Sequence, residues 1–468
     1  MLTRRRLIGR AVVTALATLG IRRLGDGSTG AAALLRSVGK PPREQHLLPN
    51  PKVIRHEGVE VLVPPLHHRV ITARLLVDPT KVAMRGARGA LEDVLGQVDT
   101  LGAASPLGLA VTVAWGLPYF RRFVPGQTRR ELPIDRRASS RSRAVRVLED
   151  AQRFQSDPPD TILERNDVAV LLRSDDLDLV DEAQQRLSGD LTDVLAITSV
   201  RTGVVGGGFG GAESLPNQIA TSAKVQGAEL MPPTAELFLG FTSTVRASLG
   251  PPKIANFETL GYAALRNAYF VGGTHMHLSH INEDLLAWYL NLDHRERSDA
   301  MFHPGLKLER TRQTVPQSRS DAETVGALRR DYARYHQIGH AGAIQSASRL
   351  DRDVVSHDGT VYRKGTAVPQ RADFNTIDNP FAWSSAPVRD QMSATPRAGV
   401  HFVVFNPTSD DFRRVRLAMD GILPDGTRLA FKGRFGQGLN AVLRTTHRQN
   451  FLVPPRPHRS FPLSELRA

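Results

Sequence analysis

The spacing of apolar residues from about residue 56 onward predicts alternating strands and helices. Closely spaced apolar residues predict strands, and apolar residues three or four apart predict helices with one buried face. In the first half the predicted strands are 70–77, 109–115, 168–172 and 194–200, and the predicted helices are 91–101 and 177–187. The order strand, helix, strand, strand, helix, strand is that of a ferredoxin-like unit.

The second half repeats this order more loosely. Strands are predicted within 269–280, 400–405 and 450–453, a helix starts at Leu285, and another follows the capping sequence 406–409. The segment 291–398 is far longer than an ordinary connection, and segments of that length usually build a site. We therefore expect an α+β fold of two tandem ferredoxin-like domains, of the dimeric α+β barrel type, with antiparallel sheets and helices on one face.

The expected domain boundaries follow from these patterns. The first domain is predicted at 56–204 and the second at 241–468, joined by a Gly- and Pro-rich junction at 205–240. The junction contains Gly206-x-Gly208-x-x-Gly211, which matches a dinucleotide fingerprint on paper. We interpret it as a hinge, because a polar stretch with Pro216 follows where the fingerprint requires a helix.

Residues 1–40 have the pattern of an export signal and linker. Arg4-Arg5-Arg6 precedes Leu7-Ile8, and a mild apolar run of eleven residues extends from Ala11 to Ile21. Paired arginines before a short apolar run are typical of twin-arginine (Tat) signals, and eleven residues are too few to span a bilayer. The alternative is a basic cytosolic N-terminus, since no clean Ala-x-Ala site follows. We expect export to the periplasm, cell envelope or medium, and no membrane span.

Charge and cysteine content narrow the classes of protein and of functional site that are open to this chain. The chain of 468 residues has a formal net charge of +14 and no cysteine, which excludes disulfides, thiolate metal sites and cysteine nucleophiles. Residues 1–30 contribute +5 of this charge, and nine arginines lie in 121–146, which we predict as a long exposed loop. Since no aromatic-interleaved basic groove accompanies them, we expect no nucleic-acid partner.

Three histidines crowd one predicted strand. His275 and His277 share a face because strand side chains alternate, and a metal site with a third ligand such as His303 or His357 is conceivable. The alternative is that these histidines are packed or solvated at a sheet edge.

His340 ends the stretch Tyr335-His336-Gln337-Ile338-Gly339-His340. Gly339 would stop a helix here, so His340 is expected at a helix terminus. An axial ligand to haem iron needs a neutral imidazole with one free nitrogen. A lone histidine is more often structural, so this signal is weak by itself.

Several short segments occur in a recognisable order. They are Gly58-Val59 to Pro64-Pro65, Leu239-Gly240-Phe241-Thr242-Ser243-Thr244, Gly272-Gly273-Thr274 with Trp288, His340, Tyr362-Arg363-Lys364-Gly365, Phe402-Val403-Val404-Phe405 and Phe451-Leu452-Val453-Pro454-Pro455. Together they make the chain resemble the dye-decolorising (DyP-type) peroxidases from about residue 56 to 456. These are haem enzymes built of two ferredoxin-like halves, often exported with Tat signals.

The resemblance implies a haem b cofactor and a set of site residues. His340 would be the proximal iron ligand, Arg363 the distal arginine, and Gly240 and Phe241 part of the haem-binding segment. A permanently charged planar donor such as Arg363 would stabilise negative charge on peroxide. The alternative for Arg363 is a surface arginine.

The sequence departs from the family at the distal motif. The pattern Gly-x-x-Asp-Gly reads Gly240-Phe241-Thr242-Ser243-Thr244 here, so Ser243 replaces the aspartate that shuttles a proton. A serine is a far weaker base, and losing a general acid–base group typically costs about 10²–10⁴-fold in rate. Asp373 and Asp378 lie in the segment after Arg363, but the sequence nominates neither as a substitute.

The resemblance therefore implies an exported haem peroxidase that is slow. Its expected partners are hydrogen peroxide, a small organic or dye-like electron donor and the Tat export machinery, with assembly into a homo-oligomer left open. The alternative is a non-enzymatic exported protein that binds haem, or a metal at the histidine strand.

Overall fold

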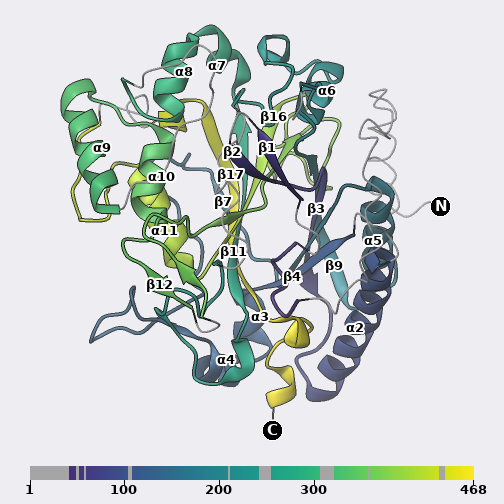
Figure 1. Cartoon of the computed structure of the whole chain (residues 1–468). Helices are drawn as coiled ribbons and strands as arrows, with labels where there is room; N and C mark the ends of the chain where they lie inside the picture. The colour runs from purple at the N-terminus through teal and green to yellow at the C-terminus, as the bar shows by residue number, and fades with distance from the viewer. Residues whose placement is uncertain are drawn as a thin grey trace.

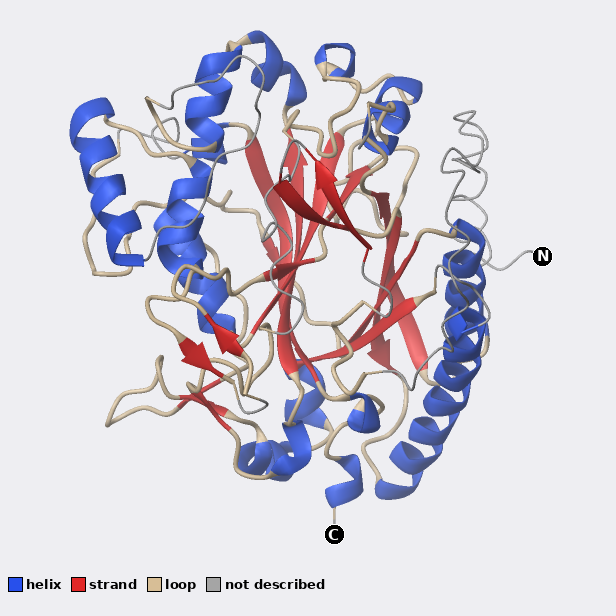
Figure 2. Cartoon of the chain, in the orientation of Figure 1, coloured by secondary structure: helices blue, strands red, loops and turns tan. Residues whose placement is uncertain are grey.

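The structure is a computed structural model. It describes residues 42–48, 52–56, 59–103, 108–208, 211–241, 254–305, 321–356, 359–431 and 438–467. The predicted export signal and Ser243 lie outside the described residues, as does His357. Helices flank a central body of strands on two sides, with α2 and α5 on the right and α8 to α11 on the left (Figures 1 and 2).

The first half confirms the predicted ferredoxin-like order. Its strands are β3 (His67–Leu75), β4 (Ala110–Gly116), β8 (Val168–Ser174) and β9 (Leu195–Val204), and its helices are α2 (Lys81–Ala103) and α5 (Leu177–Gly189). The strands lie in the order β9-β3-β8-β4, and every pairing is antiparallel. Asp176 caps α5 by accepting a hydrogen bond from the backbone N–H of Asp178. Both helices cover the same face of the sheet, where their apolar sides bury a shared core.

The second half has the same arrangement. Its strands are β11 (Thr274–Glu283), β15 (Phe374–Ile377), β16 (Ala398–Asn406) and β17 (Leu443–Val453), in the order β17-β11-β16-β15. Helix α11 (Ser409–Met419) follows β16 and begins with a capping box between Thr408 and Asp411. The long segment between β11 and β16 supplies β15 and helix α10 (His340–Ser348), which packs on α11.

The two sheets join into a closed ring of eight strands. Strand β9 pairs with β15 through Val204 and Asn375, and β4 pairs with β17 through Trp115 and Leu452. The fourth strand of each half therefore pairs with the second strand of the other half. Apolar side chains of both halves fill much of the interior, among them Val70, Leu171, Met276, Phe405 and Phe451. The two halves thus share one interior, as in the dimeric α+β barrel type.

The arginine-rich segment is more ordered than predicted. It includes the end of α3, the whole of α4 and two short strands, so the prediction of one long loop is wrong for the part of 121–146 that forms these elements.

The remaining elements are β1 (Lys52–His56), β2 (Val59–Val63), α3 (Leu117–Arg122), α4 (Pro125–Glu131), β5 (Ile134–Asp135), β6 (Val145–Arg146), β7 (Ile162–Leu163), α6 (Leu215–Ser222), β10 (Ala263–Ala264), α7 (Leu285–Leu290), α8 (His294–Met301), α9 (Asp321–Tyr335), β12 (Val354–Val355), β13 (Val361–Tyr362) and β14 (Gln370–Arg371).

The glycine-rich junction does lead to a helix. Ser214 caps α6, and Pro216 fits its first turn, where the missing N–H has no helical partner. Gly206 adopts a left-handed φ of 82°, which glycine tolerates. The backbone N–H of Gly208 donates to the carboxylate of Glu236, which fixes the glycine-rich segment. None of the helices in the described part of the chain has an apolar stretch long enough to cross a bilayer.

Candidate functional site

His340 is the first residue of α10. Helix α9 ends at Tyr335, and Gly339 is the N-cap of α10, so His340 lies at a helix terminus, but it begins a new helix where the sequence analysis expected the end of one. A Cβ on Gly339 would lie 2.1 Å from the carbonyl oxygen of Phe302, so only glycine fits there without displacing backbone. The N–H of Gly342 donates to the same carbonyl at 3.2 Å. Phe302 therefore fixes the start of the helix that carries His340.

The imidazole of His340 is neutral and has a free nitrogen. Its Nδ1 is buried and has no hydrogen-bond partner among the described residues. Burial, and after it the charges of Arg371 and Arg416, lower the pKa of His340 to about 3. A neutral ring with an unused nitrogen is the form in which histidine coordinates a metal.

An ion pair lies on the sheet face that α11 covers. In the strand register, Arg371 of β14 pairs with Val404 of β16, and Val404 pairs with His277 of β11. The ring of His277 stacks on Phe412 of α11, with centroids 3.4 Å apart. Paired residues of antiparallel strands share a face, so Arg371 also faces the helices. Its Nε and Nη2 donate to the two carboxylate oxygens of Asp373 at 3.0 and 2.7 Å. Burial lowers the pKa of Arg371, but the carboxylate outweighs burial and raises it.

A second carboxyl group adds to this electrostatic environment. Glu283 ends β11, and its Oε2 is buried without a partner. Burial, and after it the charge of Asp373, raise the pKa of Glu283 to about 8. Glu283 is therefore protonated at neutral pH. We call His340, Arg371, Asp373 and Arg416 the His340 cluster.

Gly240 and Phe241 lie near the start of α10. Gly240 has a left-handed φ of 85°, and a Cβ there would lie 2.6 Å from the hydroxyl of Tyr289. The ring of Phe241 packs edge-on against Phe302, with centroids 5.2 Å apart. Phe302 thus links this segment to the helix of His340, although the structure describes nothing from 242 to 253.

Arg363 lies apart from the His340 cluster. Its side chain is 77% exposed and pairs with Asp353 at 2.5 Å. The side chain is therefore directed at a surface carboxylate, while Arg371, which the sequence analysis did not single out, is within electrostatic reach of His340. Arg371 and Asp373 are two residues apart in an extended segment, and this spacing alone could have indicated that they share a face.

The histidine strand is buried: His275 and His277 are both fully covered, and neither ring nitrogen of His275 has a hydrogen-bond partner among the described residues. His277 uses both ring nitrogens, one with Asn450 at 2.7 Å and the other with Ser279 at 2.6 Å. His303 bonds the carbonyl of Pro304. Within the described ranges, no group of three or more His, Asp or Glu side chains is arranged to hold a metal ion.

A cavity of about 400 Å³ opens on the same face as His277. Phe154, Phe412 and His277 contribute rings to its lining, and Arg143 and Arg413 are among its charged residues. The guanidinium of Arg416 lies 5.2 Å from the centroid of Phe154. Arg416 therefore contacts a ring of the cavity lining and is also within electrostatic reach of His340.

Solved structures with a similar fold are DyP-type peroxidases. The enzyme from Cellulomonas bogoriensis is 16% identical, with a TM-score of 0.49, covering 89% of this chain and 96% of that one. The encapsulated enzyme from Mycobacterium smegmatis is 12% identical, with a TM-score of 0.46, covering 85% and 95%. A DypB variant from Rhodococcus jostii, solved in complex with heme, is 13% identical, with a TM-score of 0.46, covering 86% and 96%.

Sequence comparison adds a family. A search of curated proteins found no match. The model of a family of unknown function (DUF7405) matches residues 65–455, which is most of the chain. The chain belongs to this family.

Proposed function

We propose that the protein binds haem through His340 and uses peroxide to oxidise a small organic donor by one electron at a time. The observation that carries the proposal is the neutral imidazole of His340, which has a ring nitrogen without a hydrogen-bond partner among the described residues, begins a helix and lies within electrostatic reach of Arg371. The DyP-like order of sequence segments supports the same choice of residue.

The described residues fit haem chemically. His340 would supply the nitrogen ligand to the iron, and the cation of Arg416 suits a carboxylate group of haem. Haem, when bound, supplies the iron that exchanges electrons with peroxide.

Arg371 and Asp373 would carry the polar chemistry of the chain itself. Arg371 offers a fixed positive charge that stabilises negative charge developing on a peroxide oxygen. Asp373 orients Arg371 through two hydrogen bonds, and its carboxylate is the group that we assign to holding and returning a proton. In this proposal Arg371 and Asp373 take the roles expected of Arg363 and of the missing distal aspartate.

We assign the organic donor to the cavity beside Phe154. Aromatic rings on its lining suit a planar molecule, and the charged residues, Arg143 and Arg413 with Glu149, Asp150 and Asp410, suit polar substituents. The export signal, and with it a location outside the cytoplasm, is part of this proposal and rests on the sequence of residues 1–40.

A haem carrier without turnover is the second candidate. It is favoured by Ser243, which stands where the family has its proton-shuttling aspartate. Steady-state oxidation of a phenolic donor with hydrogen peroxide by the haem-loaded protein separates the two. Turnover that is lost in Arg371→Ala, with haem still bound, supports the peroxidase, and no turnover above free haem supports the carrier.

A further inference from the structure

The interior of the barrel holds a row of three histidines. The register pairs His280 of β11 directly with His401 of β16 and with His447 of β17. All three are at most 1% exposed. The ring centroids of His280 and His401 are 4.9 Å apart, and those of His280 and His447 are 6.4 Å apart. They lie on the inner face, opposite to the face of the His340 cluster.

The segment between β15 and β16 closes over this row. The ring of Trp383 lies 5.1 Å from His280, 5.9 Å from His401 and 5.0 Å from His447. Asp378 approaches Nε2 of His280 at 3.2 Å, and Asp390 approaches Nε2 of His447 at 3.7 Å. We call residues 378–393 the covering segment.

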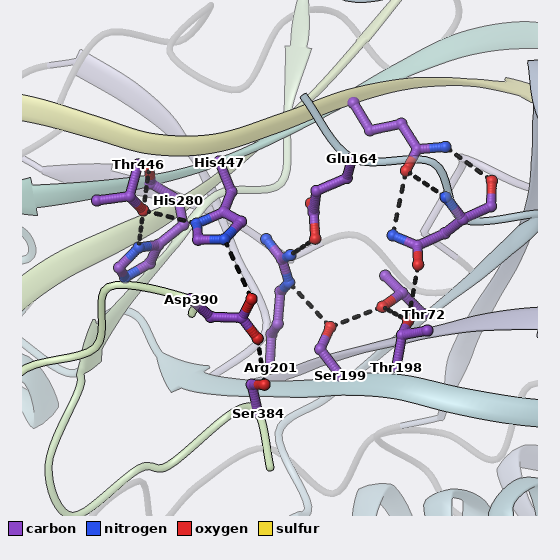
Figure 3. Close-up of polar contacts among 12 residues, drawn as sticks. Thr72, Glu164, Thr198, Ser199, Arg201, His280, Ser384, Asp390, Thr446 and His447 are labelled. Carbon is purple, nitrogen blue, oxygen red and sulfur yellow. Dashed lines mark hydrogen bonds and ion pairs between the residues drawn. The ribbon is translucent and has the colours of Figure 1, made fainter. Parts of the chain in front are cut away.

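The same segment fastens the two halves together. The N–H of Val200 in β9 donates to the carbonyl of Trp383 at 2.9 Å. The guanidinium of Arg201 lies 4.8 Å from the centroid of the Trp383 ring, and it also pairs with Glu164 at 2.6 Å (Figure 3). Strands β9 and β15 pair at one position only, so these contacts add substantially to the connection between the two halves at this edge.

The three histidines differ in the neighbouring groups that would stabilise a proton bound to the ring. His280 and His447 both bond the hydroxyl of Thr446, at 2.6 and 2.9 Å, and Asp390 faces His447 (Figure 3). Asp378 faces His280. His401 has no hydrogen-bond partner on either ring nitrogen among the described residues. Its ring neighbours include His280, Trp383, and Phe374 at 5.2 Å. No carboxylate of the described segments pairs with it, and Arg201 is a positive charge nearby.

We propose that the histidine row is an acid-operated latch, in which proton uptake by His401 releases the covering segment from the first half. A proton on His401 in the closed state would sit in an apolar, cationic surrounding, whereas the opened segment would give it water. Burial, and after it the neighbouring His280, Arg201 and His447, lowers the pKa of His401 well below 6.5. Opening is therefore coupled to protonation below about pH 6.5 and rises up to about tenfold per pH unit for this one group.

Amide hydrogen exchange on the full chain, corrected for intrinsic rates, tests the latch. Between pH 7 and pH 5 we expect protection of Val200 and of residues 378–393 to fall by about tenfold or more, while Leu171 in β8 stays protected. His401→Phe keeps a ring of similar size beside Phe374 and should abolish most of this change. His275→Phe removes an equally buried histidine on the other face of β11, whose pKa burial lowers to about 3, and it should leave the change intact.

Two results would overturn the latch. One is equal protection of Val200 at pH 7 and pH 5 in the unmodified protein, which requires no variant to fold. The other is the same pH dependence in His401→Phe as in the unmodified protein. Because the row shares no residue with the His340 cluster, both results are independent of haem.

Discussion

Arg371 and Asp373 form a two-point ion pair on the helix-covered face of the second-half sheet, with Nη2 and Oδ2 2.7 Å apart. Asp373 is buried and Arg371 is half-buried, so the pair is largely shielded from solvent. If it performs the polar chemistry, Asp373→Asn should lower turnover with peroxide by about 10²-fold or more. Retained haem absorbance with this loss would locate the effect in proton transfer, and unchanged turnover would exclude Asp373.

The two candidate arginines give opposite expectations. Arg363→Ala removes an exposed ion pair, so the free energy of unfolding should change by less than about 0.5 kcal/mol and turnover should be retained. Arg371→Ala leaves Asp373 buried without its partner and should destabilise the protein by about 1–3 kcal/mol. Loss of turnover in Arg363→Ala but not in Arg371→Ala would reverse our assignment. Urea unfolding and donor oxidation, measured on both variants, decide the matter.

Ser243→Asp tests whether a missing base limits turnover. It places a carboxylate at the position where the DyP-type distal motif has an aspartate, and it should raise turnover if a missing base limits the rate. Ser243→Asn is the matched control, because it has similar size and no basic carboxylate. An equal rate in both variants would remove this explanation.

The start of α10 should tolerate no side chain at Gly339. Gly339→Ala puts a Cβ 2.1 Å from a backbone oxygen and should cost a few kcal/mol of unfolding free energy together with haem affinity. Gly326→Ala in α9, where the nearest atom is the tip of Arg330 at 3.5 Å, should instead stabilise by about 0.5–1 kcal/mol. If both variants unfold at the same urea concentration, the packing that we describe around Phe302 is wrong.

Glu283 predicts a stability that falls as pH rises. Its folded pKa of about 8 lies above the reference value of 4.5, so the folded state binds the proton more tightly between these values. Stability from this group is complete below about pH 4.5 and is lost as pH rises to about 8. Glu283→Gln should therefore gain a few kcal/mol relative to the unmodified protein at pH 8, and nothing at pH 4.5. Urea midpoints that shift equally at both values would contradict the burial of this carboxyl.

Much of the fold could be predicted because its cores repeat regular spacings. The apolar residues of β3, β4, β8, α2 and α5 alternate or recur every three to four positions, and the predicted elements are confirmed. Strand β15 was missed. It has only four residues. The side chains of Asn375 and Thr376 donate hydrogen bonds to backbone carbonyls of β9, so the strand has no alternation of apolar residues that would mark it in the sequence.

The candidate site could be predicted only in part, for a similar reason. His340 and Gly339 are local in sequence, and their place at a helix terminus is confirmed. Arg371 acquires its position from the pairing of β14 with β16, some thirty residues away, which no local pattern encodes. The histidine row depends likewise on three strands that are far apart in the sequence, although each histidine alone looks unremarkable.

Haem titration of the purified protein tests the central proposal most directly. The haem-free protein should bind one haem per chain and develop a sharp Soret band, and His340→Ala should lose or strongly shift that band. His336→Asn is the matched control, since this exposed residue has a left-handed φ of 54° that asparagine tolerates. No Soret band in the unmodified protein, or an identical band in His340→Ala, would contradict the assignment of His340 as the ligand.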